Sequence, residues 1–125
     1  MRADNGEGQT TDFDGSLAIG GGNLAMRPMQ TLLASLGACS SIDVILLLKK
    51  QRQPLRDLKL RIDADREEGK VPSLFTKINV HYDLYGDLKP AKVERALQLS
   101  MDELCSVGLM LKKQCPITYS YEIHA

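Results

Sequence analysis

The longest apolar stretch of the chain predicts a helix over residues 28–50. Apolar residues occupy most faces of this helix, so we expect it to be central and buried. Proline suits its first turn and the basic residues suit its last turn. Small residues in its middle would let another backbone approach closely: Ala34, Ser35, Gly37, Ala38, Ser40 and Ser41.

Three later segments alternate apolar and polar residues, which predicts half-buried strands over residues 58–65, 77–84 and 117–123. The first two are expected to form a hairpin with a long connection. A weaker pattern at Phe13, Leu17 and Ile19 predicts a short strand near the N-terminus.

A second helical region is predicted over residues 91–113, where apolar residues recur at helical spacing. Ser100 and Glu103 have the form of a capping box, which predicts a break at that point. Cys105 would then lie in the first turns of a second helical piece.

These elements predict an α+β protein with two long helices and antiparallel strands segregated from them. With 125 residues, the chain is expected to be one domain, 1–125. So small a sheet cannot easily cover a 23-residue apolar helix, so we expect a homodimer that shares the helix.

Charge and composition narrow the function. Sixteen basic residues balance sixteen acidic ones, which gives no electrostatic reason to expect a nucleic acid or membrane partner. Asp43 lies inside the apolar stretch, and a charge at the centre of a bilayer costs at least ~2.5 kcal/mol. Three widely spaced cysteines do not resemble a secreted disulfide framework, so we expect a cytoplasmic protein.

The three thiols are the first candidates for chemistry. Cys39 lies on the first helix, Cys105 on the apolar face of the second helical region, and Cys115 before the last strand. In the cytosol a cysteine pair is more often catalytic or redox-sensing than structural. The alternative for each thiol is simple packing, because free cysteine is often buried as a small hydrophobe.

No metal site and no cofactor are predicted. The chain has no CxxC motif, and a zinc site needs three or four converging ligands. His81 lies on the polar side of a predicted strand and His124 lies near the C-terminus, so both are expected to be solvated. Gly20-Gly21-Gly22 lacks the features of a phosphate-binding loop and is interpreted as a connector.

Two segments resemble the OsmC/organic hydroperoxide resistance family. Residues 27–44, centred on Gly37-Ala38-Cys39-Ser40-Ser41, resemble that family's central helix. The Leu104-Cys105-Ser106-Val107 segment resembles its second cysteine segment. The similarity covers about residues 14–125 and is greatest to the broad OsmC-like branch.

The resemblance implies an OsmC-like fold, with antiparallel sheets around two long central helices in an intertwined homodimer. It also implies a thiol peroxidase for organic hydroperoxides, with active sites at the subunit interface. By the family's pattern, Cys39 would attack the peroxide and Cys105 would resolve the product. The reductant would be a dithiol such as a lipoylated protein.

The sequence departs from the hydroperoxide branch at the active-site cation. That branch holds an arginine with a glutamate at the start of the central helix, where this chain has Met29 and Gln30. Arg27 is the nearest candidate cation. Asp43, one turn beyond Cys39, is expected to point elsewhere or pair with a base, because its charge would raise a nearby thiol pKa.

A cation matters because thiolate formation alone gains little. Lowering a thiol pKa by ~2.5 raises the thiolate fraction about thirtyfold but reduces nucleophilicity about thirteenfold. Two alternatives to a peroxidase remain open. One is a protein of the same fold that binds a small ligand and leaves its thiols unused, and the other is a redox sensor whose disulfide forms without turnover.

Overall fold

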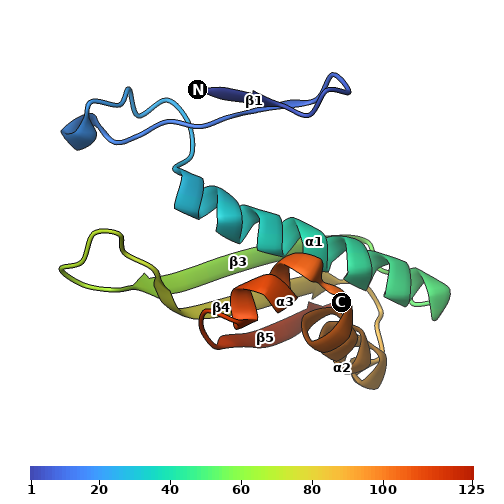
Figure 1. Cartoon of the computed structure of the whole chain (residues 1–125). Helices are drawn as coiled ribbons and strands as arrows, with labels where there is room; N and C mark the ends of the chain where they lie inside the picture. The colour runs from blue at the N-terminus through green and yellow to red at the C-terminus, as the bar shows by residue number, and fades with distance from the viewer. The chain divides into compact units, whose positions relative to one another are not determined.

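The computed structural model describes residues 1–125 and consists of two compact units, Met1–Ala34 and Ser35–Ala125. Figure 1 shows the course of the chain through them. The prediction of a single domain over residues 1–125 stays a prediction.

The first unit begins with a small hairpin. Strands β1 (Arg2–Asp4) and β2 (Thr10–Asp12) pair antiparallel. The predicted strand through residues 13–19 is wrong, because Leu17–Ile19 form a turn of 3-10 helix that ends at Gly20 with a positive φ. The Asp14 carboxylate organises this loop by accepting backbone N–H groups of Gly15, Gly22 and Leu24, and these bonds lower the pKa of Asp14.

Helix α1 (Pro28–Lys50) has the predicted bounds and crosses from the first unit into the second. In the second unit Leu36, Ser40, Val44 and Leu48 are buried, and their fourfold spacing places them on one face. The expected burial of the helix is only partial in the single chain, since Ile42, Ile45 and Leu46 are exposed.

Helix α1 is also long and apolar enough to cross a membrane, with a mean hydropathy of 2.0 over its best window. Core helices of soluble proteins pass the same test of length and composition. In the single chain 28% of that window is buried.

The second unit contains a three-stranded sheet in the order β3–β4–β5. Strands β3 (Asp57–Arg66) and β4 (Phe75–Tyr85) form the predicted antiparallel hairpin. Strand β5 (Ile117–His124) runs parallel to β4, so the prediction of purely antiparallel strands is wrong. The helical connection between β4 and β5 makes the parallel return possible.

The second helical region is not one long helix. Helix α2 (Pro90–Leu99) runs into a wide π-helical turn at Ser100–Leu104, and α3 (Ser106–Lys112) follows. The predicted break is confirmed, but Cys105 caps the second piece and Ser100 does not cap it. Ser100 is fully buried, and its hydroxyl bonds other side chains.

The helices pack on one face of the sheet. Ile78, Val80, Tyr82 and Leu84 alternate along β4 and are fully buried on that face. Helix α1 approaches closely at Gly37, where an added Cβ would lie 2.9 Å from Ile62 Cδ1. Helix α3 lies beside α1 (Figure 1), and the residues of β4 between the buried ones face away from the helices.

Candidate active site

The structure brings together two of the three cysteines. Cys39 lies in the middle of α1 and Cys105 immediately before α3. Their sulfur atoms and a carboxylate oxygen of Asp43 all lie within 4.8 Å of one another. Both thiols are free. A disulfide requires about 2.05 Å between sulfurs, so a modest local approach would join the pair.

Cys105 is held by the start of α3. Its extended backbone caps the helix, and its Sγ accepts the Gly108 N–H at 3.3 Å. The side chain is 0% exposed. Burial raises the pKa of the Cys105 thiol to about 11. The neighbouring Cys39 and Asp43 also raise this pKa, whereas the hydrogen bond from Gly108 lowers it. Cys105 is therefore a protonated thiol at neutral pH. Cys105 is buried, whereas Cys39 is partly exposed.

A chain of hydroxyl groups connects this site to the sheet. Tyr82 Oη lies 2.6 Å from Ser40 Oγ, which lies 2.8 Å from Ser100 Oγ. Ser100 donates to Asp43 Oδ2 at 3.1 Å. Because each hydroxyl has a single proton, Ser40 then donates to Ser100 and Tyr82 donates to Ser40. The chain therefore ends on the carboxylate beside the two thiols.

The position of Asp43 corrects the expectation from sequence. Asp43 points toward the thiols, and it makes no ion pair with a base; its partner is the Ser100 hydroxyl. A carboxylate there disfavours a thiolate. It can also accept the proton that a thiol must lose on reaction, so its presence changes how the site can work.

Arg27, the predicted cation, belongs to the first unit and is engaged locally. Its guanidinium donates to the Ala25 carbonyl at 3.0 Å and to the Asn23 side chain. Its backbone N–H donates to Gln30 Oε1 at 3.0 Å. The proposed role of Arg27 at the thiols stays a prediction.

Cys115 stands apart from the pair. It lies just before β5, is 6% exposed, and burial raises the pKa of its thiol. It is not part of the Cys39–Asp43–Cys105 cluster. These features agree with a packing role.

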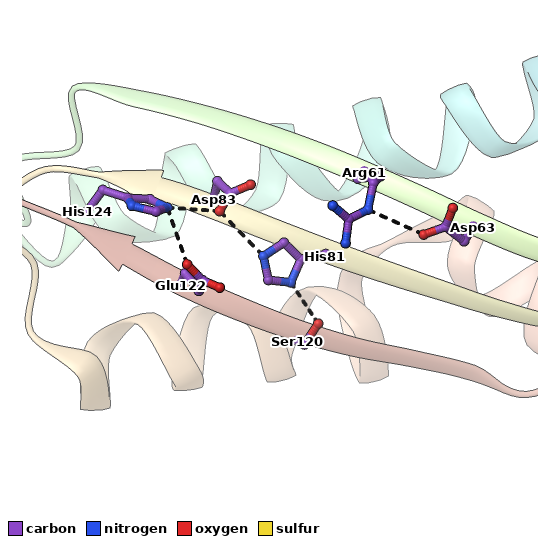
Figure 2. Close-up of polar contacts among 7 residues, drawn as sticks. All are labelled: Arg61, Asp63, His81, Asp83, Ser120, Glu122 and His124. Atoms are coloured by element: carbon purple, nitrogen blue, oxygen red, sulfur yellow. Dashed lines mark hydrogen bonds and ion pairs between the residues drawn. The ribbon is translucent and has the colours of Figure 1, made fainter.

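A second polar cluster lies on the opposite face of the sheet (Figure 2), where His81, Asp83, Glu122 and His124 come together. The expectation that both histidines are solvated is wrong for His81, whose side chain is 14% exposed, whereas His124 approaches Asp83 and remains 37% exposed. Two groups could thus hold a metal ion by their donor atoms: Cys39 with Asp43 and Cys105, and Asp83 with Glu122 and His124.

Comparison with known proteins agrees with this fold. The family model described as OsmC-like protein matches residues 20–120. The chain belongs to the OsmC-like family. Protein YhfA of Escherichia coli is 46% identical over 105 residues, which are 83% of this chain and 78% of that protein.

Two solved structures show the OsmC-like fold in three dimensions. One, from structural genomics, is 41% identical and has a TM-score of 0.86, over 98% of this chain and 88% of its own. An organic hydroperoxide resistance protein OsmC from Legionella pneumophila has a TM-score of 0.71, over 94% of this chain and 85% of its own. At 16% identity, the Legionella protein supports the fold alone. The predicted family resemblance is confirmed.

The hydroxyl chain of this OsmC-like protein was missed at the level of sequence. Ser40 stands in the buried fourfold series of α1, and Ser100 stands between Leu99 and Met101. A serine inside an otherwise apolar face is a signal of a buried hydrogen bond, because burying a hydroxyl without a partner is costly. The identity of the partner, here Tyr82, required the structure.

Proposed function

We propose that this OsmC-like protein is a thiol peroxidase that reduces organic hydroperoxides through Cys39 and Cys105. The observation that carries the proposal is the meeting of these two thiols, from distant parts of the chain, within 4.8 Å. The substrate class is proposed from the family resemblance; a protein of the same fold from Legionella pneumophila is named an organic hydroperoxide resistance protein.

The environments of the two thiols support different roles for them. Cys39 is partly exposed and can meet a peroxide, so it is the nucleophile. Cys105 is fully buried, and with a pKa of about 11 it remains protonated until it is used. A buried thiol next to the nucleophile is suited to resolve an intermediate that has already formed.

The reaction balances with these two residues. The Cys39 sulfur attacks the terminal oxygen of the hydroperoxide, the O–O bond breaks, and an alcohol leaves with one proton. Cys39 becomes a sulfenic acid, and Cys105 condenses with it to give a disulfide and water. A dithiol, such as the lipoyl group of a lipoylated protein, supplies two electrons and two protons to restore both thiols.

Asp43 gives the proton a route. Its carboxylate lies within 4.8 Å of both sulfurs and is held by Ser100. It accepts the proton of Cys39 as the sulfur attacks and gives it to the departing alkoxide, which therefore leaves as a neutral alcohol. Arg27 remains the candidate for a cation that steadies that alkoxide.

The exposed side of α1 supports a homodimer. Ile42 and Leu46 are each 60% exposed and Ile45 is 45% exposed in the single chain. A monomer seldom leaves a contiguous apolar patch of this kind in water. A second copy of the chain covers this side in our proposal.

The unpaired thiols also fit the reducing cytoplasm, where a dithiol can recharge them.

A peroxide assay with single cysteine variants tests the proposal. Purified protein is given cumene hydroperoxide with dihydrolipoamide, and consumption of the peroxide is followed. We expect turnover that falls on the order of 100-fold or more in Cys39→Ser and strongly in Cys105→Ser. Cys115→Ser is the matched control and should keep turnover within about twofold.

Two outcomes would contradict a peroxidase in different ways. Wild-type turnover no faster than that of Cys39→Ser, with both thiols still reduced after peroxide, would leave a ligand-binding protein. A Cys39–Cys105 disulfide that forms without sustained peroxide consumption would leave a redox sensor. Mass spectrometry of the alkylated protein distinguishes the two.

A further inference from the structure

The parallel pairing of β4 and β5 brings together two histidines and two carboxylates, all of which can bind a metal ion. In the register of the two strands Asp83 lies opposite Glu122, His81 opposite Ser120, and His124 one step further along opposite Tyr85. His81, Asp83, Glu122 and His124 all point to the side of the sheet that the helices leave open, as Figure 2 shows. The cluster is separate from the thiol site, whose Tyr82 lies on the other face.

Donor atoms in this cluster converge at distances suited to a metal ion. His124 Nε2 lies 2.9 Å from Asp83 Oδ1 and 3.9 Å from Glu122 Oε2. The donor atoms of all three residues lie within 4.8 Å of one another. Ligands bound tetrahedrally to zinc at about 2.0–2.1 Å lie about 3.3 Å apart, so small side-chain rotations would complete the site.

We propose that Asp83, Glu122 and His124 bind a divalent transition-metal ion of the zinc type, with water as the remaining ligand. An imidazole together with two carboxylates favours zinc, nickel or copper over magnesium or calcium, which prefer oxygen ligands alone. The two carboxylates also neutralise the charge of the ion.

His81 and Tyr85 hold the ligands in position. His81 is only 14% exposed; its Nδ1 lies 2.8 Å from Ser120 Oγ, and its Nε2 lies 3.4 Å from Asp83 Oδ1. When the Ser120 hydroxyl donates to Nδ1, the opposite N–H of His81 faces the Asp83 carboxylate. Hydrogen bonds of this kind orient metal ligands. The His124 ring stacks on Tyr85 at 4.7 Å and 20°.

The nearby cations of β3 are engaged with other groups. Lys59 lies opposite Asp83 in the sheet, but its Nζ lies 5.5 Å above the Tyr85 ring. Arg61 lies opposite His81, and its Nε pairs with Asp63 at 3.4 Å. Their charge weakens the binding of a cation without occupying the ligands. Together with the partial exposure of His124 and Glu122, this predicts micromolar affinity.

Cobalt(II) is the probe for the test, because its spectrum reports its ligands. Tag-free, reduced and chelator-treated protein is titrated with cobalt(II), and zinc(II) is then used to displace it. We expect one ion per chain, with visible bands but no near-ultraviolet sulfur-to-cobalt band. His124→Gln should weaken binding about 100-fold and His81→Gln about tenfold, as expected for a ligand and for its supporting residue. Circular dichroism verifies that the variants are folded.

Two controls make the result decisive. Thr118→Ala changes the same face of β5 outside the cluster and should leave the affinity within about twofold. The double variant Cys39→Ser/Cys105→Ser should also bind cobalt unchanged. The proposal is overturned if no ion binds at micromolar concentration, if binding survives His124→Gln, or if it shows the sulfur band and disappears in the cysteine double variant. None of these outcomes depends on peroxide turnover.

Discussion

Three consecutive residues of β4 serve two different clusters. Tyr82 points to the helices and is linked through Ser40 and Ser100 to Asp43, beside the thiols, whereas His81 and Asp83 point to the open face. On the helix side, burial raises the pKa of Cys105 and keeps it neutral. On the open side, the hydrogen bond from His124 lowers the pKa of Asp83 and keeps it charged. Tyr82 is thus bonded to a neutral hydroxyl on the buried face, whereas Asp83 is paired as a carboxylate with a histidine on the open face.

Truncation of neighbouring residues should show the largest difference between the two faces. Tyr82→Ala removes a fully buried ring that holds Ser40, and we expect a loss of about 3–5 kcal/mol in the free energy of unfolding. His81→Ala should cost less, about 1 kcal/mol, because it removes a smaller ring and one hydrogen bond to the exposed Ser120. Urea unfolding followed by circular dichroism measures both.

Tyr82→Phe separates the hydroxyl from the ring in the same experiment. It keeps the packing and removes only the bond to Ser40, so we expect a loss of about 1 kcal/mol. Equal losses in Tyr82→Ala and His81→Ala would contradict the assignment of the two faces.

The alternation of apolar and polar residues was sufficient to predict the two faces. It placed Val80, Tyr82 and Leu84 on one side of β4 and His81 and Asp83 on the other. It could not predict that β5 lies beside β4 and runs parallel to it, because that depends on where the helical connection returns the chain. The parallel register of β5 brings Glu122 and His124 to Asp83, so local spacing in the sequence could not predict the open-face cluster.

The thiol site was found from sequence for a different reason. Hydrophobic spacing alone left Cys39, Cys105 and Cys115 as candidates, and only the family resemblance selected the first two. The orientation of Asp43 could not be predicted, because its partner Ser100 lies in an irregular π-helical turn. Electrostatic reasoning placed Asp43 away from the thiols because it ignored a hydroxyl partner that stabilises the charge.

Removal of the charge at Asp43 gives the next largest effect, on activity. If Asp43 transfers the proton, Asp43→Asn should lower peroxide turnover about 100-fold, a typical contribution of general acid–base catalysis. If its charge only hinders thiolate formation, the variant should be faster than wild type. Stopped-flow measurement of Cys39 oxidation distinguishes the two, and Glu67→Gln, in the β3–β4 loop, is the matched control.

Alkaline pH should destabilise the helix side of the sheet. The pKa of Cys105 is raised from 9.0 to about 11, so its thiol is easier to ionise in the unfolded chain than in the folded one. This contribution to stability is complete below pH 9 and is lost as the pH rises from 9 to 11, by an amount on the order of 2 kcal/mol. Burial also raises the pKa of Tyr82, which extends the decline in the same direction.

Urea unfolding at intervals from pH 8 to pH 11 measures this decline under reducing conditions. Cys105→Ala should be less stable at every pH but should show a shallower decline between pH 9 and pH 11, since the contributions of Tyr82 and Cys115 remain. Parallel curves for the two proteins would mean that Cys105 ionises as readily in the folded state as in the unfolded state.

Two serines test the difference between the two faces at the level of single hydrogen bonds. Ser100 belongs to the helix side and Ser120 to the open face. Ser100 is fully buried between Ser40 and Asp43, whereas Ser120 bonds only His81 on the open face. Ser100→Ala leaves buried polar groups without a partner, so we expect a loss of about 1–2 kcal/mol. Ser120→Ala should cost less than about 0.5 kcal/mol, because water can replace the lost hydroxyl near the surface. Thermal and urea unfolding measure both, and a larger loss in Ser120→Ala would mean that the open face, not the thiol site, contains the hydrogen bonds on which the sheet depends.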